Sequence, residues 1–177
     1  AAELLDINAR RAAKSGFAHR VEDIEYHDFA LGFPFEETPD QQTSIDQVLM
    51  DMASGQAMDR VICGDVGFGK TEVCMRAAFV SVQNNKQVSV LVPTTLLAQQ
   101  HFHNFRDRFA DWPIRIEVLS RFVPRKRQDA IMQDVAEGKV DILLGTHKLL
   151  QKNLRYKDLG LVIIDEEHRF GVRHKEP

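Results

Sequence analysis

The stretch Gly64-Asp65-Val66-Gly67-Phe68-Gly69-Lys70-Thr71 matches the pattern G-x-x-x-x-G-K-[ST], and its place in the chain decides the fold. Glycines at these positions let backbone N–H groups converge on one point, as the binding of a phosphate group requires. A short apolar run, 60–63, precedes the stretch, and a segment of helical composition follows it. Because the N-terminal end of such a helix attracts anions, this order predicts a phosphate-binding loop rather than a chance match.

Two side chains of this loop suit a bound nucleotide. Lys70 can reach the β- and γ-phosphates as a point charge, and the Thr71 hydroxyl can ligate Mg²⁺. The loop therefore predicts a site for ATP with Mg²⁺. The predicted nucleotide contacts in the loop are Gly64, Asp65, Val66, Gly67, Phe68, Gly69, Lys70 and Thr71.

From residue 60 onward, apolar runs of strand length alternate with helical segments. Strands are expected at 60–63, 88–92, 114–119, 141–146 and 159–168. Helices are expected at 41–52, from the phosphate loop to about residue 82, at 96–110 and at 124–137. This alternation predicts an α/β fold with a mostly parallel sheet that helices cover on both faces. A further helix is expected at 1–15, ahead of the sheet.

The most apolar of these runs, Leu161–Ile164, leads directly into Asp165, Glu166, Glu167 and His168. Because ligands of open α/β sheets bind at the carboxyl ends of the strands, these acids are expected beside the phosphate loop. Asp165 suits Mg²⁺, which prefers oxygen ligands, and Glu166 is expected to orient the attacking water. An acidic surface turn is the alternative, but the upstream phosphate loop favours the catalytic interpretation.

The composition is that of an ordinary globular protein. Apolar residues make up 44% of the 177 residues and charged residues 28%, which excludes a disordered tail or a collagen-like repeat. The net charge of −3 gives no indication of a nucleic-acid partner, since compact nucleic-acid-binding modules are more often basic. No apolar stretch approaches the length of a membrane span. Cys63 and Cys74 are expected to be small, buried apolar side chains.

The phosphate loop combined with Asp-Glu-Glu-His at 165–168 resembles superfamily 2 helicases and translocases. The resemblance implies a RecA-like P-loop NTPase domain that binds ATP and Mg²⁺ and hydrolyses ATP. It also implies that His168 couples the ATP site to the nucleic-acid site. The predicted catalytic residues are Lys70, Asp165, Glu166 and His168.

The segment Phe-Pro-Phe-Glu-Glu-Thr-Pro-Asp-Gln at 33–41 resembles the adenine-recognition motif of the same group. The resemblance implies that Gln41 reads the edge of the adenine base. It also implies that an upstream aromatic ring packs on the base, and both Phe33 and Phe35 are candidates for that ring.

Two further segments resemble those with which this group contacts the nucleic-acid backbone. They are Pro-Thr-Thr-Leu-Leu-Ala-Gln at 93–99 and Gly-Thr-His at 145–147, and Arg121 and Lys148 lie near loops that are expected to face DNA. The predicted DNA contacts are Thr94, Thr95, Gln99, Arg121, Thr146, His147 and Lys148.

The longer string Asp-Glu-Glu-His-Arg-Phe-Gly-Val-Arg at 165–173 resembles a narrower subgroup, which holds the RecG branched-DNA helicase and the bacterial transcription-repair coupling factors. Extended similarity favours the coupling factors. This implies a motor that translocates on double-stranded DNA in the bacterial cytoplasm, displaces stalled RNA polymerase and recruits the excision-repair damage-recognition protein. A RecG-type branched-DNA helicase is the alternative.

The resemblance also suggests how the chain is organised. Residues 1–30 are expected to form an N-terminal linker helix and connector, and residues 31–177 the first RecA-like motor domain. The expected domain is incomplete, because motif III and the second motor domain do not follow the acidic motif. This chain alone is therefore expected to hydrolyse ATP weakly or not at all, and a nucleotide- or DNA-binding module without turnover is a further alternative.

Overall fold

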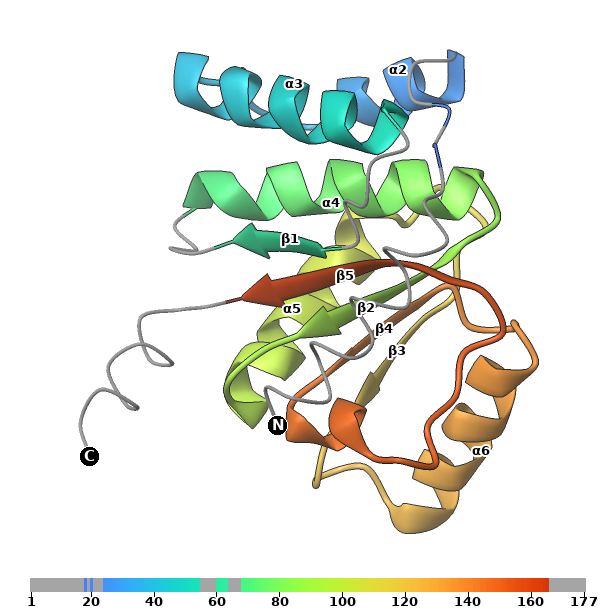
Figure 1. Cartoon of the computed structure of the whole chain (residues 1–177). Coiled ribbons are helices and arrows are strands. Elements are labelled where there is room, and N and C mark those ends of the chain that lie inside the picture. Colours follow the sequence, from blue (N-terminus) through green and yellow to red (C-terminus); the bar gives the residue numbers. More distant parts are fainter. Residues whose placement is uncertain (1–17, 19, 21–23, 55–59, 64–67, 166–177) are drawn as a thin grey trace, which may run out of the picture.

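A computed structural model describes residues 18, 20, 24–54, 60–63 and 68–165, with the side chains of 60–70 left undescribed. Helices and strands alternate along most of this length (Figure 1). In chain order the elements are α2 (Ile24–Leu31), α3 (Pro39–Ala53), β1 (Arg60–Cys63), α4 (Phe68–Gln83), β2 (Gln87–Leu91), α5 (Thr95–Arg108), β3 (Ile116–Leu119), α6 (Arg125–Ala136), β4 (Ile142–Gly145), the 3₁₀ helix η1 (His147–Leu150) and β5 (Leu159–Asp165).

The five described strands form one sheet in the order β1-β5-β2-β4-β3, and every neighbouring pair is parallel. The register places the last residues of the strands side by side. Cys63 pairs with Asp165, and Gly145 pairs with both Leu91 and Leu119. Four connections therefore leave the sheet from the same edge, where α/β proteins bind their ligands. The predicted α/β class with a parallel sheet is confirmed.

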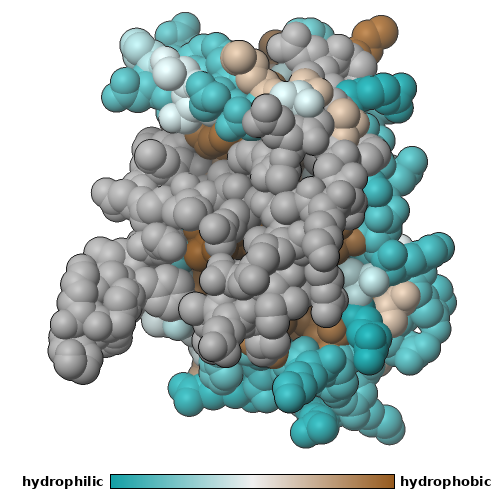
Figure 2. All heavy atoms as spheres, viewed as in Figure 1, coloured by the Kyte–Doolittle hydropathy of each residue, from teal (hydrophilic) through white to brown (hydrophobic). Residues whose placement is uncertain are grey.

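Helices cover both faces of the sheet, as predicted. The larger core packs α4 and α5 against one face, and the smaller core packs α6 and η1 against the other. In Figure 1, α2 and α3 lie outside α4 as an additional layer. The outer surfaces of α3 and α6 are largely hydrophilic on the face shown in Figure 2. No helix in the described part of the chain is long and apolar enough to cross a membrane.

The helix α2 was not predicted from the sequence. Its buried residues are Tyr26 and Phe29, which form too narrow an apolar stripe to give a helical pattern over eight residues. Phe29 is completely buried and stacks on Phe79 and Phe109, with ring centroids 4.3 and 4.9 Å apart. Tertiary packing of one aromatic side chain therefore stabilises a helix that local periodicity does not reveal.

Other expectations have mixed outcomes. The helix expected at 41–52 is α3, which begins at Pro39 after the N-cap Thr38 and ends at Ala53. Cys74 is buried as expected, but it is disulfide-bonded, which the sequence did not suggest. The helix expected at 1–15 lies outside the described residues. The division after residue 30 stays a prediction, although α2 packs on α4 and shares its core.

Candidate functional site

Two predicted Mg²⁺ ligands meet at the carboxyl edge of the sheet. Asp165 ends β5 and is 3% exposed, and Thr71 lies half-buried on the first turns of α4. Both line a cavity of about 20 Å³, which is large enough for a single water molecule. The other lining residues are Cys74, Val90, His101, Phe105 and Ile163. A hydroxyl oxygen and a carboxylate are hard ligands, so this pair fits Mg²⁺.

Several predicted site residues can be placed only by their backbone or not at all. Phe68, Gly69 and Lys70 belong to the first turn of α4, which follows the strand β1 as the phosphate-loop pattern requires. The remaining predicted residues of the loop and of the acidic motif lie outside the described residues: Gly64, Asp65, Val66, Gly67, Glu166 and His168. Their roles stay predictions.

A buried histidine contacts the predicted Mg²⁺ ligand Asp165. His101 comes from α5, is 8% exposed, and places Nε2 2.9 Å from Asp165 Oδ2. Its other ring nitrogen, Nδ1, is buried and has no hydrogen-bond partner in the described part of the chain. Sequence reasoning missed this contact, because 64 residues separate the two side chains and no local pattern links them.

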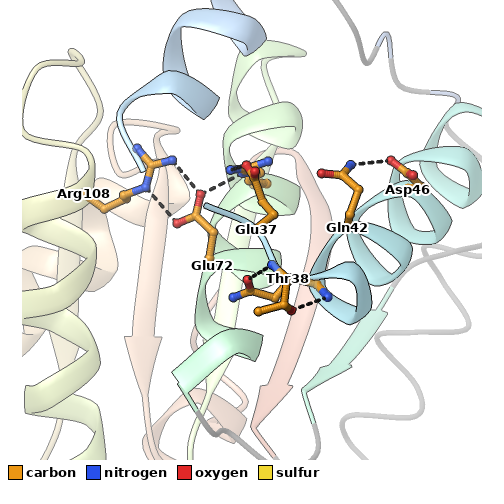
Figure 3. A network of polar contacts seen from close by, with 8 residues as sticks. Glu37, Thr38, Gln42, Asp46, Glu72 and Arg108 are labelled. Atoms are coloured by element: carbon orange, nitrogen blue, oxygen red, sulfur yellow. Dashed lines mark hydrogen bonds and ion pairs between the residues drawn. The ribbon is translucent and has the colours of Figure 1, made fainter. Parts of the chain in front are cut away.

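A second polar network joins two glutamates and two arginines (Figure 3). Glu72, the residue after Thr71, accepts two hydrogen bonds from Arg108 at 2.8 and 2.6 Å. It also accepts one from Arg76 Nε at 2.7 Å, and Arg76 Nη2 donates to Glu37 at 2.5 Å. The network therefore joins α4, α5 and the segment that leads into α3. Only the spacing of Glu72 and Arg76 by four residues could have been noticed in the sequence.

The network favours the charged forms of Glu37 and Arg76. The hydrogen bond from Arg76 lowers the pKa of Glu37, and an interaction with the charge of Arg76 adds to the effect. Burial alone would lower the pKa of Arg76, but hydrogen bonds to Glu37 and Glu72 outweigh burial and raise it. Two carboxylates therefore balance two guanidinium groups, and of the four side chains Glu37 is the most exposed, at 29%.

The predicted adenine-recognition segment is anchored by this network. The Arg76 guanidinium lies over the Phe33 ring, 5.6 Å from its centroid, whereas Phe35 is 60% exposed. Gln41 forms a capping box, in which Thr38 N–H donates to Gln41 Oε1 at 2.8 Å and Gln41 N–H donates to Thr38 Oγ1 at 3.1 Å. Gln41 thus has a structural role at the start of α3, in addition to its predicted role with adenine.

The predicted DNA contacts follow the carboxyl ends of three strands. Thr94, Thr95 and Gln99 follow β2, and Arg121 follows β3 as an exposed residue. The Thr94 hydroxyl is already used at the start of α5, where it accepts from Leu97 N–H at 3.1 Å.

The third group of predicted DNA contacts follows β4. Thr146 is 4% exposed, so its side chain offers little surface to a partner. His147 is exposed and Lys148 is half-buried on η1. The fold brings the predicted contact segments to one edge, while their contacts with DNA stay predictions.

Comparison with known proteins agrees with this geometry. A model of the DEAD/DEAH box helicase family matches residues 38–177. The chain is 67% identical to the transcription-repair-coupling factor of Escherichia coli and 62% identical to that of Haemophilus influenzae, over 99% of its length. It spans only 15% of the length of each of these relatives. A solved structure of RecG bound to a three-way DNA junction superposes with a TM-score of 0.78 at 31% identity, covering 92% of this chain and 23% of that one.

Proposed function

The chain belongs to the DEAD/DEAH box helicase family, and from this premise we propose that it is the first ATP-binding motor domain of a double-stranded DNA translocase. The observation that carries the proposal is the meeting of Thr71 and Asp165 in one cavity at the carboxyl edge of the sheet. The predicted DNA segments leave the neighbouring strands at that edge. ATP and DNA would therefore bind close together, as coupling between them requires.

In the proposed mechanism the chain mainly positions ATP, Mg²⁺ and the attacking water and stabilises the charge of the phosphates. Lys70 and the backbone N–H groups of the loop hold the phosphates, and Thr71 and Asp165 hold Mg²⁺. When held by these residues, Mg²⁺ would help to neutralise the negative charge of the phosphates. Glu166 orients the attacking water and accepts its proton. The proposed activity is phosphoryl transfer from ATP to water, stimulated by duplex DNA.

The parent protein is proposed to be a transcription-repair coupling factor. Identities of 67% and 62% to two such factors favour it over a RecG-type helicase, the alternative that the RecG structure represents at 31% identity. The wider activity of displacing RNA polymerase and recruiting the excision-repair damage-recognition protein would need parts of those relatives that this chain does not match. A location in the bacterial cytoplasm belongs to the same proposal.

Replacement of Lys70 by alanine tests the proposed ATP site. We expect Lys70→Ala to abolish ATP binding measured by calorimetry, and any phosphate release stimulated by duplex DNA, because the loop loses its point charge on the phosphates. Lys139→Ala is a matched control, since Lys139 is exposed near the opposite edge of the sheet, just before β4. Equal ATP binding by both variants would contradict the proposal. ATP binding without turnover in the unaltered chain would support the alternative of a binding module.

Replacement of Phe35 by alanine tests the adenine end of the site. Phe35 is the more exposed candidate, because the Arg76 guanidinium already covers Phe33. Loss of base stacking costs about 1–3 kcal/mol, so we expect ATP affinity to fall about 5- to 150-fold. Phe122→Ala is the control, since Phe122 is 67% exposed and lies after β3. An unchanged dissociation constant for ATP in Phe35→Ala would exclude Phe35 as the stacking residue.

A further inference from the structure

We propose that His101 is a positioning residue that orients the Asp165 carboxylate toward Mg²⁺, and through which α5 is linked to the metal site. The proposal rests on the proposed function, because it assigns Asp165 to Mg²⁺. The contact itself is direct, since His101 Nε2 lies 2.9 Å from Asp165 Oδ2 and both residues are buried. His101 is not one of the residues predicted to bind nucleotide or metal.

The chemistry of the pair determines the direction of the hydrogen bond. Asp165 would bind Mg²⁺ as a carboxylate, which only accepts hydrogen bonds, so His101 Nε2–H would be the donor in the metal-bound site. This bond occupies one lone pair of Oδ2 and restrains rotation of the carboxylate about its last bond. Partners of this kind orient metal ligands, and their loss lowers metal affinity or activity by about 10- to 100-fold.

The unsatisfied nitrogen of the same ring argues against a purely structural role. Nδ1 of His101 is buried and finds no hydrogen-bond partner within the part of the chain that the structure describes. A buried polar atom in that state costs about 1–3 kcal/mol. An aliphatic residue would fill the space beside Val90, Phe105 and Ile163 without this cost. A histidine at this position therefore lowers the stability of the core, and a role of its contact with Asp165 in the site would explain why this cost is tolerated.

The position of His101 on α5 gives the contact a wider consequence. The same helix places Arg108 on Glu72, which directly follows the predicted Mg²⁺ ligand Thr71. The helix α5 thus contacts both Asp165 itself and Glu72, the neighbour of Thr71. Its first turn follows Thr94, a predicted DNA contact. A displacement of α5 would change the relative position of both Mg²⁺ ligands.

The test compares ATP binding with and without the metal. Calorimetry with this chain measures ATP affinity in excess EDTA and again in excess Mg²⁺, and the ratio of the two affinities reports the metal site. We expect His101→Leu to leave the affinity in EDTA unchanged and to lower the ratio about 10- to 100-fold. His101→Gln should restore most of the ratio, because its amide N–H can donate to the same carboxylate. The control is His103→Leu, a change at an exposed position of the same helix.

The outcomes separate this proposal from the proposed function. A ratio in His101→Leu equal to that of the unaltered chain would overturn the positioning role alone. A parallel loss of thermal stability and of both affinities, without rescue by His101→Gln, would show that His101 is merely structural. Absence of ATP binding in the unaltered chain would overturn the proposed function. In Asp165→Asn, a further His101→Leu change should leave the ratio unaltered, because the residue that His101 orients no longer carries its charge.

Discussion

Replacing Glu72 by alanine is expected to lower the free energy of unfolding by about 3–5 kcal/mol. Glu72 is 4% exposed and is the common acceptor for Arg76 and Arg108, whose side chains are 4% and 10% exposed (Figure 3). Without Glu72, the Arg108 guanidinium loses its two charge-assisted hydrogen bonds, and Arg76 keeps its bond to Glu37 as its one ion pair among the described residues. An unpaired buried charge costs more than the intact network contributes. Urea unfolding followed by circular dichroism measures the change.

Two comparison variants make the Glu72 experiment specific. Glu36→Ala removes an exposed carboxylate next to Glu37, and we expect the free energy of unfolding to change by no more than about 0.5 kcal/mol. Replacing Glu72, Arg76 and Arg108 together by methionine should recover much of the loss, because the one charge that then remains in the network is Glu37, whose side chain is 29% exposed. A loss below about 1 kcal/mol in Glu72→Ala would mean that the guanidinium groups reach water or other acceptors, and that the network adds little to stability.

Replacing Phe29 by alanine is expected to lower the free energy of unfolding by about 3–5 kcal/mol as well. The ring is completely buried and stacks on Phe79 and Phe109 from α4 and the end of α5. The Arg108 guanidinium lies over the same ring, 3.9 Å from its centroid, so the change also removes a cation–π contact. The loss would leave a cavity at the point where α2 joins the rest of the core. Thermal and urea unfolding both measure the change.

The control for Phe29 comes from the same helix. Leu31 is 82% exposed, so Leu31→Ala should change stability by no more than about 0.5 kcal/mol. Hydrogen exchange distinguishes global from local loss. If amides of α2 exchange rapidly in Phe29→Ala while the cooperative transition stays at the same urea concentration, then α2 is a peripheral attachment. That result would contradict the expected contribution of Phe29 to the main core.

Much of the fold could be predicted from local signals. The five predicted strands are all present, and the predicted bounds of the first four lie within two residues of β1, β2, β3 and β4 at either end. The fifth begins at Leu159 as predicted, and residues 166–168 of its predicted range lie outside the described residues. Strands buried on both faces have nearly continuous apolar sequences, so they are visible within a few residues. The phosphate loop is predicted from an equally short motif, but its residues 64–67 lie outside the described part of the chain. The roles proposed for Thr71 and Asp165 could also be predicted from local signals, because each residue belongs to a short motif.

The features that were missed depend on residues far apart in the chain. His101 meets Asp165 across 64 positions, and Arg108 meets Glu72 across 36. Such pairs have no spacing that a periodic pattern could reveal. The helix α2 was missed for the same reason, because its two buried side chains pack into a core that other elements form. The preference for Phe35 over Phe33 as the proposed stacking residue also depends on a distant partner, since the Arg76 guanidinium lies over the Phe33 ring.

The sequence by itself determined the α/β class and the succession of β1 and α4, and it predicted the residues for phosphate and Mg²⁺, because each of these depends on a few adjacent residues. Only the tertiary structure decided which of these residues lie together. The pairing of β1 with β5 brings Cys63, just before the phosphate loop, beside Asp165. The packing of α5 on the sheet then brings His101 to the same carboxylate. Strand order and helix packing depend on the burial of apolar surface over the whole chain, so these contacts exist only in the folded protein.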